Sequence, residues 1–146
     1  MLVKNAKIVA YFLLSVLISS LIGGGLFYAL SKYERAYEKN PEIRQRFHNY
    51  PFTDHFFYAL LFIVATAIVY YIIAFFLAKG LSKGKQILIG AATGIIVLLA
   101  FKFTSFGYPV FQVIELLELI VVAIGGAVIA LFRYKAYRAQ VNTKMG

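Results

Sequence analysis

The sequence predicts an all-α membrane protein with four transmembrane helices in a single domain over residues 1–146. Hydrophobic residues make up 62% of the chain and charged residues only 14%, well below the roughly 25% that is typical of soluble domains. The mean hydropathy is +0.79. The apolar residues fall in runs about as long as the ~20 residues that cross a bilayer as a helix. These runs leave no room for a separate soluble domain.

The apolar runs predict helices at about 8–30, 56–78, 86–104 and 111–132. We expect them to form two antiparallel hairpins, because short connections join neighbouring helices. The first run is interpreted as a membrane helix and not as a signal peptide. It exceeds the roughly 7–15 residues of a signal-peptide core, and no small-residue cleavage motif follows it.

The basic residues of the connections predict the orientation. Lys and Arg favour cytoplasmic connections, and nine of the 15 basic residues fall on the side of both termini. All six acidic residues fall on the other side, so the net charge of +9 gathers at the terminal side. We therefore expect an N-in, C-in topology. The nine residues are Lys4, Lys7, Lys79, Lys83, Lys85, Arg133, Lys135, Arg138 and Lys144.

This basic rim predicts the partners at the membrane surface. Anionic lipid headgroups are the expected partners of such a rim. Without a soluble basic domain, nucleic acid is not an expected partner. If the protein is bacterial, the topology places it in the cytoplasmic (inner) membrane.

The connection over residues 31–55 is the longest segment outside the predicted helices. Asn40-Pro41 breaks it, and a short amphipathic helix is expected to follow. Asp54 is expected to cap the second membrane helix. No metal site is predicted here, although His48 and His55 stand near Asp54. The apolar residues of the connection are expected to lie in the headgroup layer or to form a docking surface: Tyr33, Tyr37, Ile43, Phe47 and Tyr50.

Stripes of small residues predict where helices pack closely. Such stripes run along three of the four helices, and in so small a chain we expect some of them to meet another copy or another subunit. The second helix is expected to be the more lipid-facing one, with four aromatic residues at its inner end: Tyr70, Tyr71, Phe75 and Phe76. The packing residues are Ser15, Ser19 and Gly23, then Gly90 and Gly94, then Gly125 and Gly126.

One polar cluster interrupts the apolar pattern. Glu115 and Glu118 lie one turn apart on the small-residue stripe of the fourth helix, and Lys102 near the end of the third is the nearest base. In a structural interpretation Lys102 pairs with Glu115, while Glu118 is protonated or hydrogen-bonded. In a functional interpretation the carboxylates form a proton or cation site. The sequence leaves both open.

The motifs exclude several classes of function. The chain has no Cys and no hydrolase, metalloprotease or phosphate-loop motif. The predicted membrane helices contain no His, which disfavours haem. We expect no enzyme, no cofactor and no catalytic residue. The expected function is association, as a subunit, sensor or immunity-type component of a membrane assembly. The alternative is a homo-oligomeric channel or proton- or cation-coupled carrier that uses the glutamates, and a small membrane enzyme ranks third.

Overall fold

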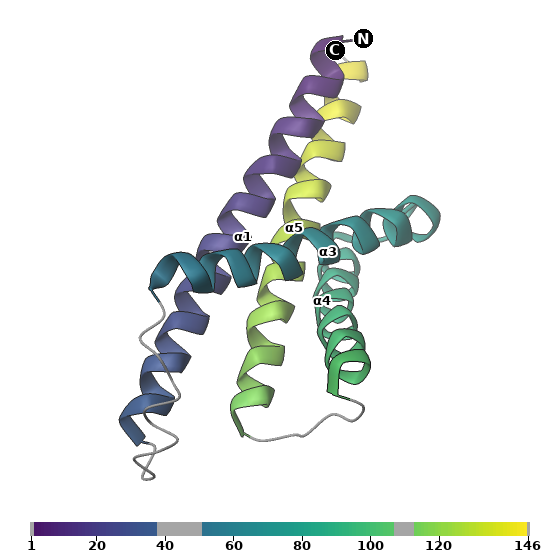
Figure 1. Ribbon diagram of the computed structural model, residues 1–146. Coiled ribbons are helices and arrows are strands. Elements are labelled where there is room, and N and C mark those ends of the chain that lie inside the picture. Colours follow the sequence, from purple (N-terminus) through teal and green to yellow (C-terminus); the bar gives the residue numbers. More distant parts are fainter. Residues whose placement is uncertain (1, 38–50, 107–112, 146) are drawn as a thin grey trace.

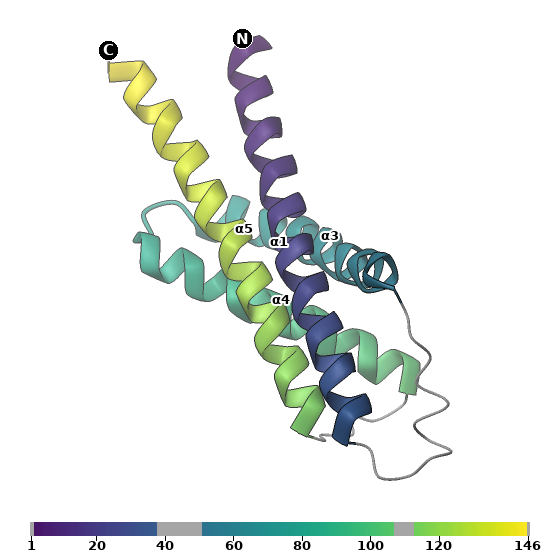
Figure 2. The ribbon, with the colours of Figure 1, turned by 90° about the vertical axis from the view of Figure 1, so that its left-hand side faces the viewer.

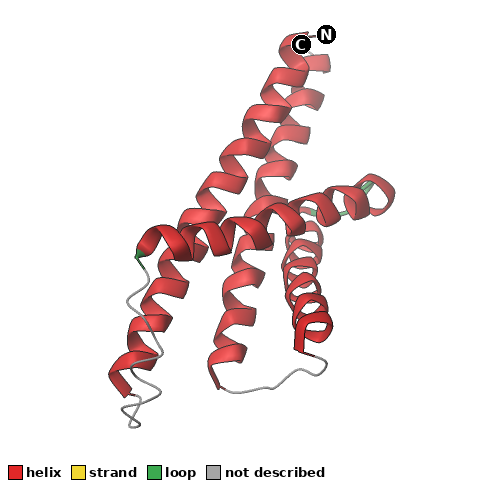
Figure 3. Cartoon of the chain, viewed as in Figure 1, coloured by secondary structure: helices red, strands yellow, loops and turns green. Residues whose placement is uncertain are grey.

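The computed structural model describes residues 2–37, 51–106 and 113–145. These residues form helices α1 (Leu2–Tyr37), α3 (Phe52–Leu77), α4 (Lys83–Phe106) and α5 (Val113–Met145). No strand occurs within the described ranges, as Figure 3 shows. All four helices are long and apolar enough to cross a membrane. The predicted class, a helical protein with four candidate membrane spans, is confirmed.

Helices α1 and α5 lie side by side and run in opposite directions, so both chain ends lie at the same end of the molecule (Figures 1 and 2). Helix α3 lies obliquely across this pair, and α4 packs mainly on α5. The described parts of α1 and α5 near the termini extend past α3 and α4 (Figure 1). We call this end the terminal end, and the other the connection end.

The helices extend beyond the predicted apolar runs. α5 ends at Met145 and not near residue 132, because its last part is rich in Ala, Lys, Arg and Gln, which favour helix. α1 likewise continues to Tyr37. Hydropathy reports only the part that matches the bilayer, so it places helix ends too early. Since α3 begins at Phe52, His55 lies inside a candidate span, contrary to the sequence-based expectation.

The start of α3 also differs from the expected cap. Pro51 is the N-cap residue and makes no side-chain cap hydrogen bond. Asp54 lies in the first turn, where its backbone N–H donates to the Pro51 carbonyl at 3.1 Å. Its negative charge there suits the positive end of the helix dipole.

Two apolar clusters join α3 to the helices beneath it. Toward the terminal end, Val16 of α1, Ile63 and Ala67 of α3 and Ile129 of α5 are buried together. Toward the connection end, the cluster brings all four helices into contact. Its buried members are Phe27, Ala59, Phe62, Leu98, Val121 and Val122.

Glycine contacts set the distance between α4 and α5. A methyl group on Gly94 would lie 2.9 Å from the carbonyl carbon of Val122. One on Gly90 would lie 2.6 Å from the Ala130 methyl group and would collide with the Gly126 carbonyl oxygen. These separations are shorter than van der Waals contact, so only glycine allows the two backbones to approach this closely.

The stripe on α1 is also used inside the chain. The Ser19 hydroxyl donates to the Gly125 carbonyl of α5 at 3.3 Å, and the buried Ser15 hydroxyl donates to the Phe12 carbonyl at 2.7 Å. Gly23 faces Ala59 of α3: a methyl group added to Gly23 would lie 3.3 Å from the Ala59 methyl group. These stripe residues thus meet neighbouring helices of the same chain, while Gly25 has nothing within 4 Å of a methyl group built on it. The expected contact of some stripes with another copy or subunit stays a prediction.

The expected exposure of the second helix holds at Phe75 and Phe76, which are 71% and 73% exposed, but it is wrong at Tyr70. Tyr70 of α3 is only 1% exposed, because α5 passes beneath this part of α3. The least covered span is α4, with 22% of its most apolar window buried against at least 33% for the others.

We predict opposite responses to two glycine substitutions. In Gly126→Ala the new methyl group meets the Gly90 carbonyl carbon at 2.7 Å, so the free energy of unfolding should fall by about 1–3 kcal/mol. Gly25→Ala is the matched control, because nothing lies within 4 Å of its methyl group. It should match or slightly exceed the stability of the parent, since alanine favours helix. Unfolding in detergent, followed by circular dichroism, measures both; equal losses would contradict the packing.

Candidate functional site

A charged pair joins α4 to α5 at the connection end of the molecule. The Lys102 ammonium nitrogen lies 2.6 Å from a carboxylate oxygen of Glu118, and the two side chains are 13% and 23% exposed. The separation brings the opposite charges into contact, although the angles do not meet those of a hydrogen bond. The pair joins the last part of α4 to the first part of α5.

Among the described side chains Lys102 meets Glu118, while the predicted pairing of Lys102 with Glu115 stays a prediction. Gly94 of α4 contacts Val122 of α5. Eight residues later in α4 stands Lys102, and eight residues earlier in α5 stands Ile114, so the two backbones lie about opposite each other there, next to Glu115. Helical side chains lean toward the N-terminus of their helix. This lean carries the long lysine stem about one turn back along α4, which on the antiparallel α5 leads to Glu118. The Glu115 side chain lies outside the described residues.

Aromatic side chains surround this clasp, as we name the Lys102–Glu118 pair. Tyr58 of α3 lies near Glu118, and its ring packs on those of Phe27 and Phe62 at 5.5 and 4.9 Å. The Phe62 ring in turn meets Phe101 of α4 at 5.0 Å. A paired charge walled by aromatic rings holds helices together at a fixed register.

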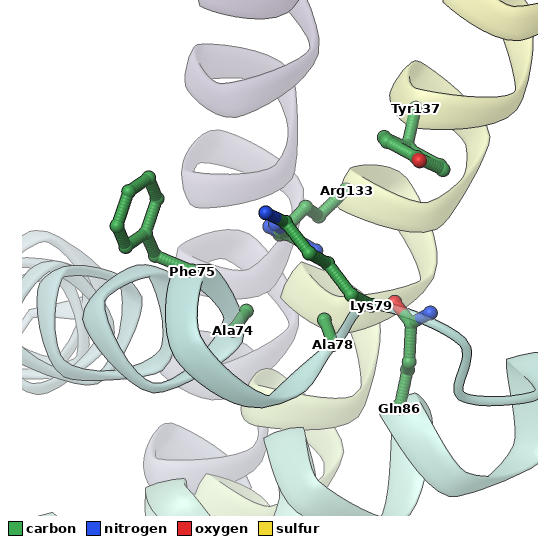
Figure 4. A pocket seen from close by; sticks show the side chains of 7 residues that line it. All are labelled: Ala74, Phe75, Ala78, Lys79, Gln86, Arg133 and Tyr137. Atoms are coloured by element: carbon green, nitrogen blue, oxygen red, sulfur yellow. The ribbon is translucent and has the colours of Figure 1, made fainter.

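A second polar group lies at the terminal end, around a cavity of about 120 Å³. Figure 4 shows Lys79, from the turn after α3, and Arg133, from α5, directed toward the same space. Gln86 of α4 and Tyr137 of α5 complete the polar lining. The apolar wall is made by Ala74, Phe75 and Ala78.

Local structure positions these groups. Gly80 has φ +86°, a left-handed conformation that favours glycine, and the Leu81 N–H donates to the Ala78 carbonyl at 3.3 Å. This tight turn holds Lys79 at the end of α3. The Gln86 side-chain amide nitrogen then donates back to the Leu81 carbonyl at 3.1 Å. The turn and the first residues of α4 thus form one rigid corner.

Arg133 is held from the side of α3. Its guanidinium lies 5.6 Å from the centre of the Tyr71 ring, within the range of a cation–π contact. The buried Tyr70 hydroxyl is near enough to interact with Arg133, yet no well-formed hydrogen bond reaches it from the described side chains.

The predicted docking surface is only partly described. Tyr33 is 57% exposed on the last turns of α1. Tyr37 ends α1, and its side chain is outside the described part of the chain. Ile43, Phe47 and Tyr50 also lie outside the described residues, together with His48 and the expected amphipathic helix. Within the described ranges no three His, Cys, Asp or Glu side chains come together as a metal site.

The sequence interpretation missed the cavity. Lys79 and Arg133 were assigned to the basic rim, but they stand 54 positions apart in the chain. One feature of the sequence could have indicated a polar site here: Gln86, an uncharged polar residue, follows the lysines at the start of α4.

Comparison with protein-family models, curated proteins and solved structures finds no match to this chain.

We predict that the clasp stabilises the fold as a pair. Lys102→Met leaves the Glu118 charge without this partner and should lower the free energy of unfolding by about 1–3 kcal/mol, between the values for exposed and buried pairs. The double variant Lys102→Met with Glu118→Leu should recover most of the loss, because neither charge then remains. Detergent unfolding of the parent, both single variants and the double variant measures the coupling. Additive losses would contradict a paired role.

Proposed function

We propose that this protein is a small membrane subunit that acts by association, as a subunit, sensor or immunity-type component of a larger membrane assembly. The Lys102–Glu118 ion pair carries the proposal. The Glu118 carboxylate is paired with Lys102 and so helps to join two helices. A carboxylate paired in this way is poorly placed to take up and release an ion. The transport alternative thereby loses the support of Glu118. We therefore look for the functional contact on the outer surface of the protein, where another subunit can bind.

The outward face of α4 is the surface that we assign to this association. Leu88, Ile96 and Phe103 are 61–70% exposed, and the exposed Ala92 lies between the first two on the same face of the helix. The small side chain between bulky ones forms a notch that allows a second helix to approach. The low coverage of α4 supports this assignment. The occupant is a membrane helix of another protein subunit.

The proposed arrangement is two antiparallel hairpins, α1 with α3 and α4 with α5. Ring contacts support the first: Phe12 meets Tyr71 at 5.2 Å, and Tyr28 meets His55 at 5.6 Å. The glycine contacts support the second. The proposed topology is N-in, C-in, supported by the basic residues that share the terminal end.

We predict that bulk on the outward face of α4 disrupts the assembly. Ala92→Phe should release the chain from its assembly in polymer nanodiscs cut from native membranes, whereas the matched control Ala29→Phe, exposed on α1, should leave it intact. Native mass spectrometry of the nanodiscs measures the bound partner. A parent chain extracted alone would contradict the proposal. Proton or cation flux in liposomes, lost in Glu118→Gln, would replace it with the transport alternative.

We predict the sidedness from single cysteines, since the chain has none of its own. A membrane-impermeant maleimide should label Asn40→Cys in intact cells and Lys83→Cys only after the membrane is opened. Both positions are outside the predicted helices, so neither substitution disturbs packing predicted from the sequence. Labelling of Lys83→Cys in intact cells would reverse the topology.

A further inference from the structure

Basic side chains gather at the terminal end of the molecule, and two of them, Lys79 and Arg133, lie at one cavity. All six acidic side chains, at positions 34, 38, 42, 54, 115 and 118, belong to the first connection or to the connection ends of the helices. Two cations that share a cavity repel each other unless an anion lies between them. The cavity lining contains no acidic side chain, and neither Asp54 nor Glu118, the acidic side chains that the structure describes, belongs to it.

The cavity also offers an unused hydrogen-bond acceptor. Gln86 is only 6% exposed, and its amide nitrogen is occupied by the Leu81 carbonyl at 3.1 Å. Its amide oxygen is buried and accepts no hydrogen bond from the described residues. A buried acceptor without a partner destabilises the fold, because it has lost its hydrogen bonds to water. A donor supplied by a ligand would remove that cost.

The rim of the cavity is apolar on the side of α3. Phe75, Phe76 and Leu77 are 61–73% exposed on the last turn of this helix, and Phe75 also lines the cavity. A soluble anion gains nothing from contact with exposed apolar side chains, whereas the acyl chains of a lipid pack against them. The cationic groups and the apolar turn thus match the two parts of a phospholipid in their natural order, headgroup beside acyl chains.

We propose that this cavity binds the headgroup of an anionic phospholipid whose phosphodiester carries a hydroxyl-bearing alcohol, such as phosphatidylglycerol. Arg133 and Lys79 bind the phosphate, since Arg and Lys are the side chains that pair with phosphate oxygens. A hydroxyl of the alcohol donates to the Gln86 amide oxygen. The acyl chains lie along Phe75 and Phe76. The site is independent of the proposed association through α4, which uses another face.

The test is native mass spectrometry of the full chain in detergent, titrated with dioctanoyl phosphatidylglycerol. Arg133→Gln and Lys79→Gln should each weaken binding about tenfold, the effect expected for one lost charge-assisted hydrogen bond. The matched controls are Arg138→Gln and Lys135→Gln, which remove the same charges from α5 outside the cavity lining. They should change the affinity less than about twofold, as loss of one exposed charge does.

Further titrations of the parent protein compare ligands that differ in the headgroup or lack the acyl chains, and the lipid comparison is repeated with Gln86→Met. Dioctanoyl phosphatidylmethanol has the same charge without the hydroxyl, so it should bind more weakly than phosphatidylglycerol, and Gln86→Met should abolish that difference. Soluble glycerol phosphate should bind far more weakly than the lipid, because it lacks the acyl chains.

Each of these arms has an outcome that overturns the proposal. Equal weakening by the cavity variants and their controls would reduce the site to a diffuse basic rim. Glycerol phosphate binding as tight as that of the lipid would make it a site for soluble phosphates. Equal affinity for the two lipids in the parent would remove the contact assigned to Gln86. If Arg133→Gln fails to fold, the exposed Lys79 and its control still decide.

Discussion

The close approach of α4 and α5 is the constraint on which the rest of the structure depends. Within lipid, apolar burial does little to drive helices together, and packing of small residues takes its place. Gly90 and Gly94 on α4 and Gly126 on α5 let the two backbones meet without side chains between them. This contact fixes the antiparallel register. The position of Glu118 within reach of Lys102 follows from it.

The two ends of the molecule then acquire different characters. At the connection end, acidic and basic side chains occur together, and the half-buried clasp lies near Tyr58, whose ring packs on those of Phe27 and Phe62. At the terminal end the basic side chains have no acidic side chains near them in the sequence. An ion pair between two side chains of the same chain contributes to the fold. Basic side chains without an acidic partner nearby in the sequence are instead suited to bind anions from outside the protein.

The candidate sites were predictable to different degrees. The sequence placed Lys102, Glu115 and Glu118 in one cluster, because their helical spacing and the short connection bring them together. It did not predict the contact of Lys102 with Glu118, because the reach of a lysine depends on the lean of its side chain along a neighbouring helix. The cavity of Lys79, Gln86 and Arg133 could not be predicted, because it depends on the oblique path of α3 over α5.

Composition and hydropathy by themselves determined the helical class, the four candidate spans and the charge asymmetry, because these follow from properties of contiguous residues. Helix ends were predicted less well, since helix continues where hydropathy falls. Only the tertiary structure decided which helix Ser19, Gly23, Gly90, Gly94 and Gly126 each meet, that Tyr70 is buried and that α4 is the least covered span. A stripe predicts that a helix packs closely, but the residue it meets depends on the directions in which the helices cross.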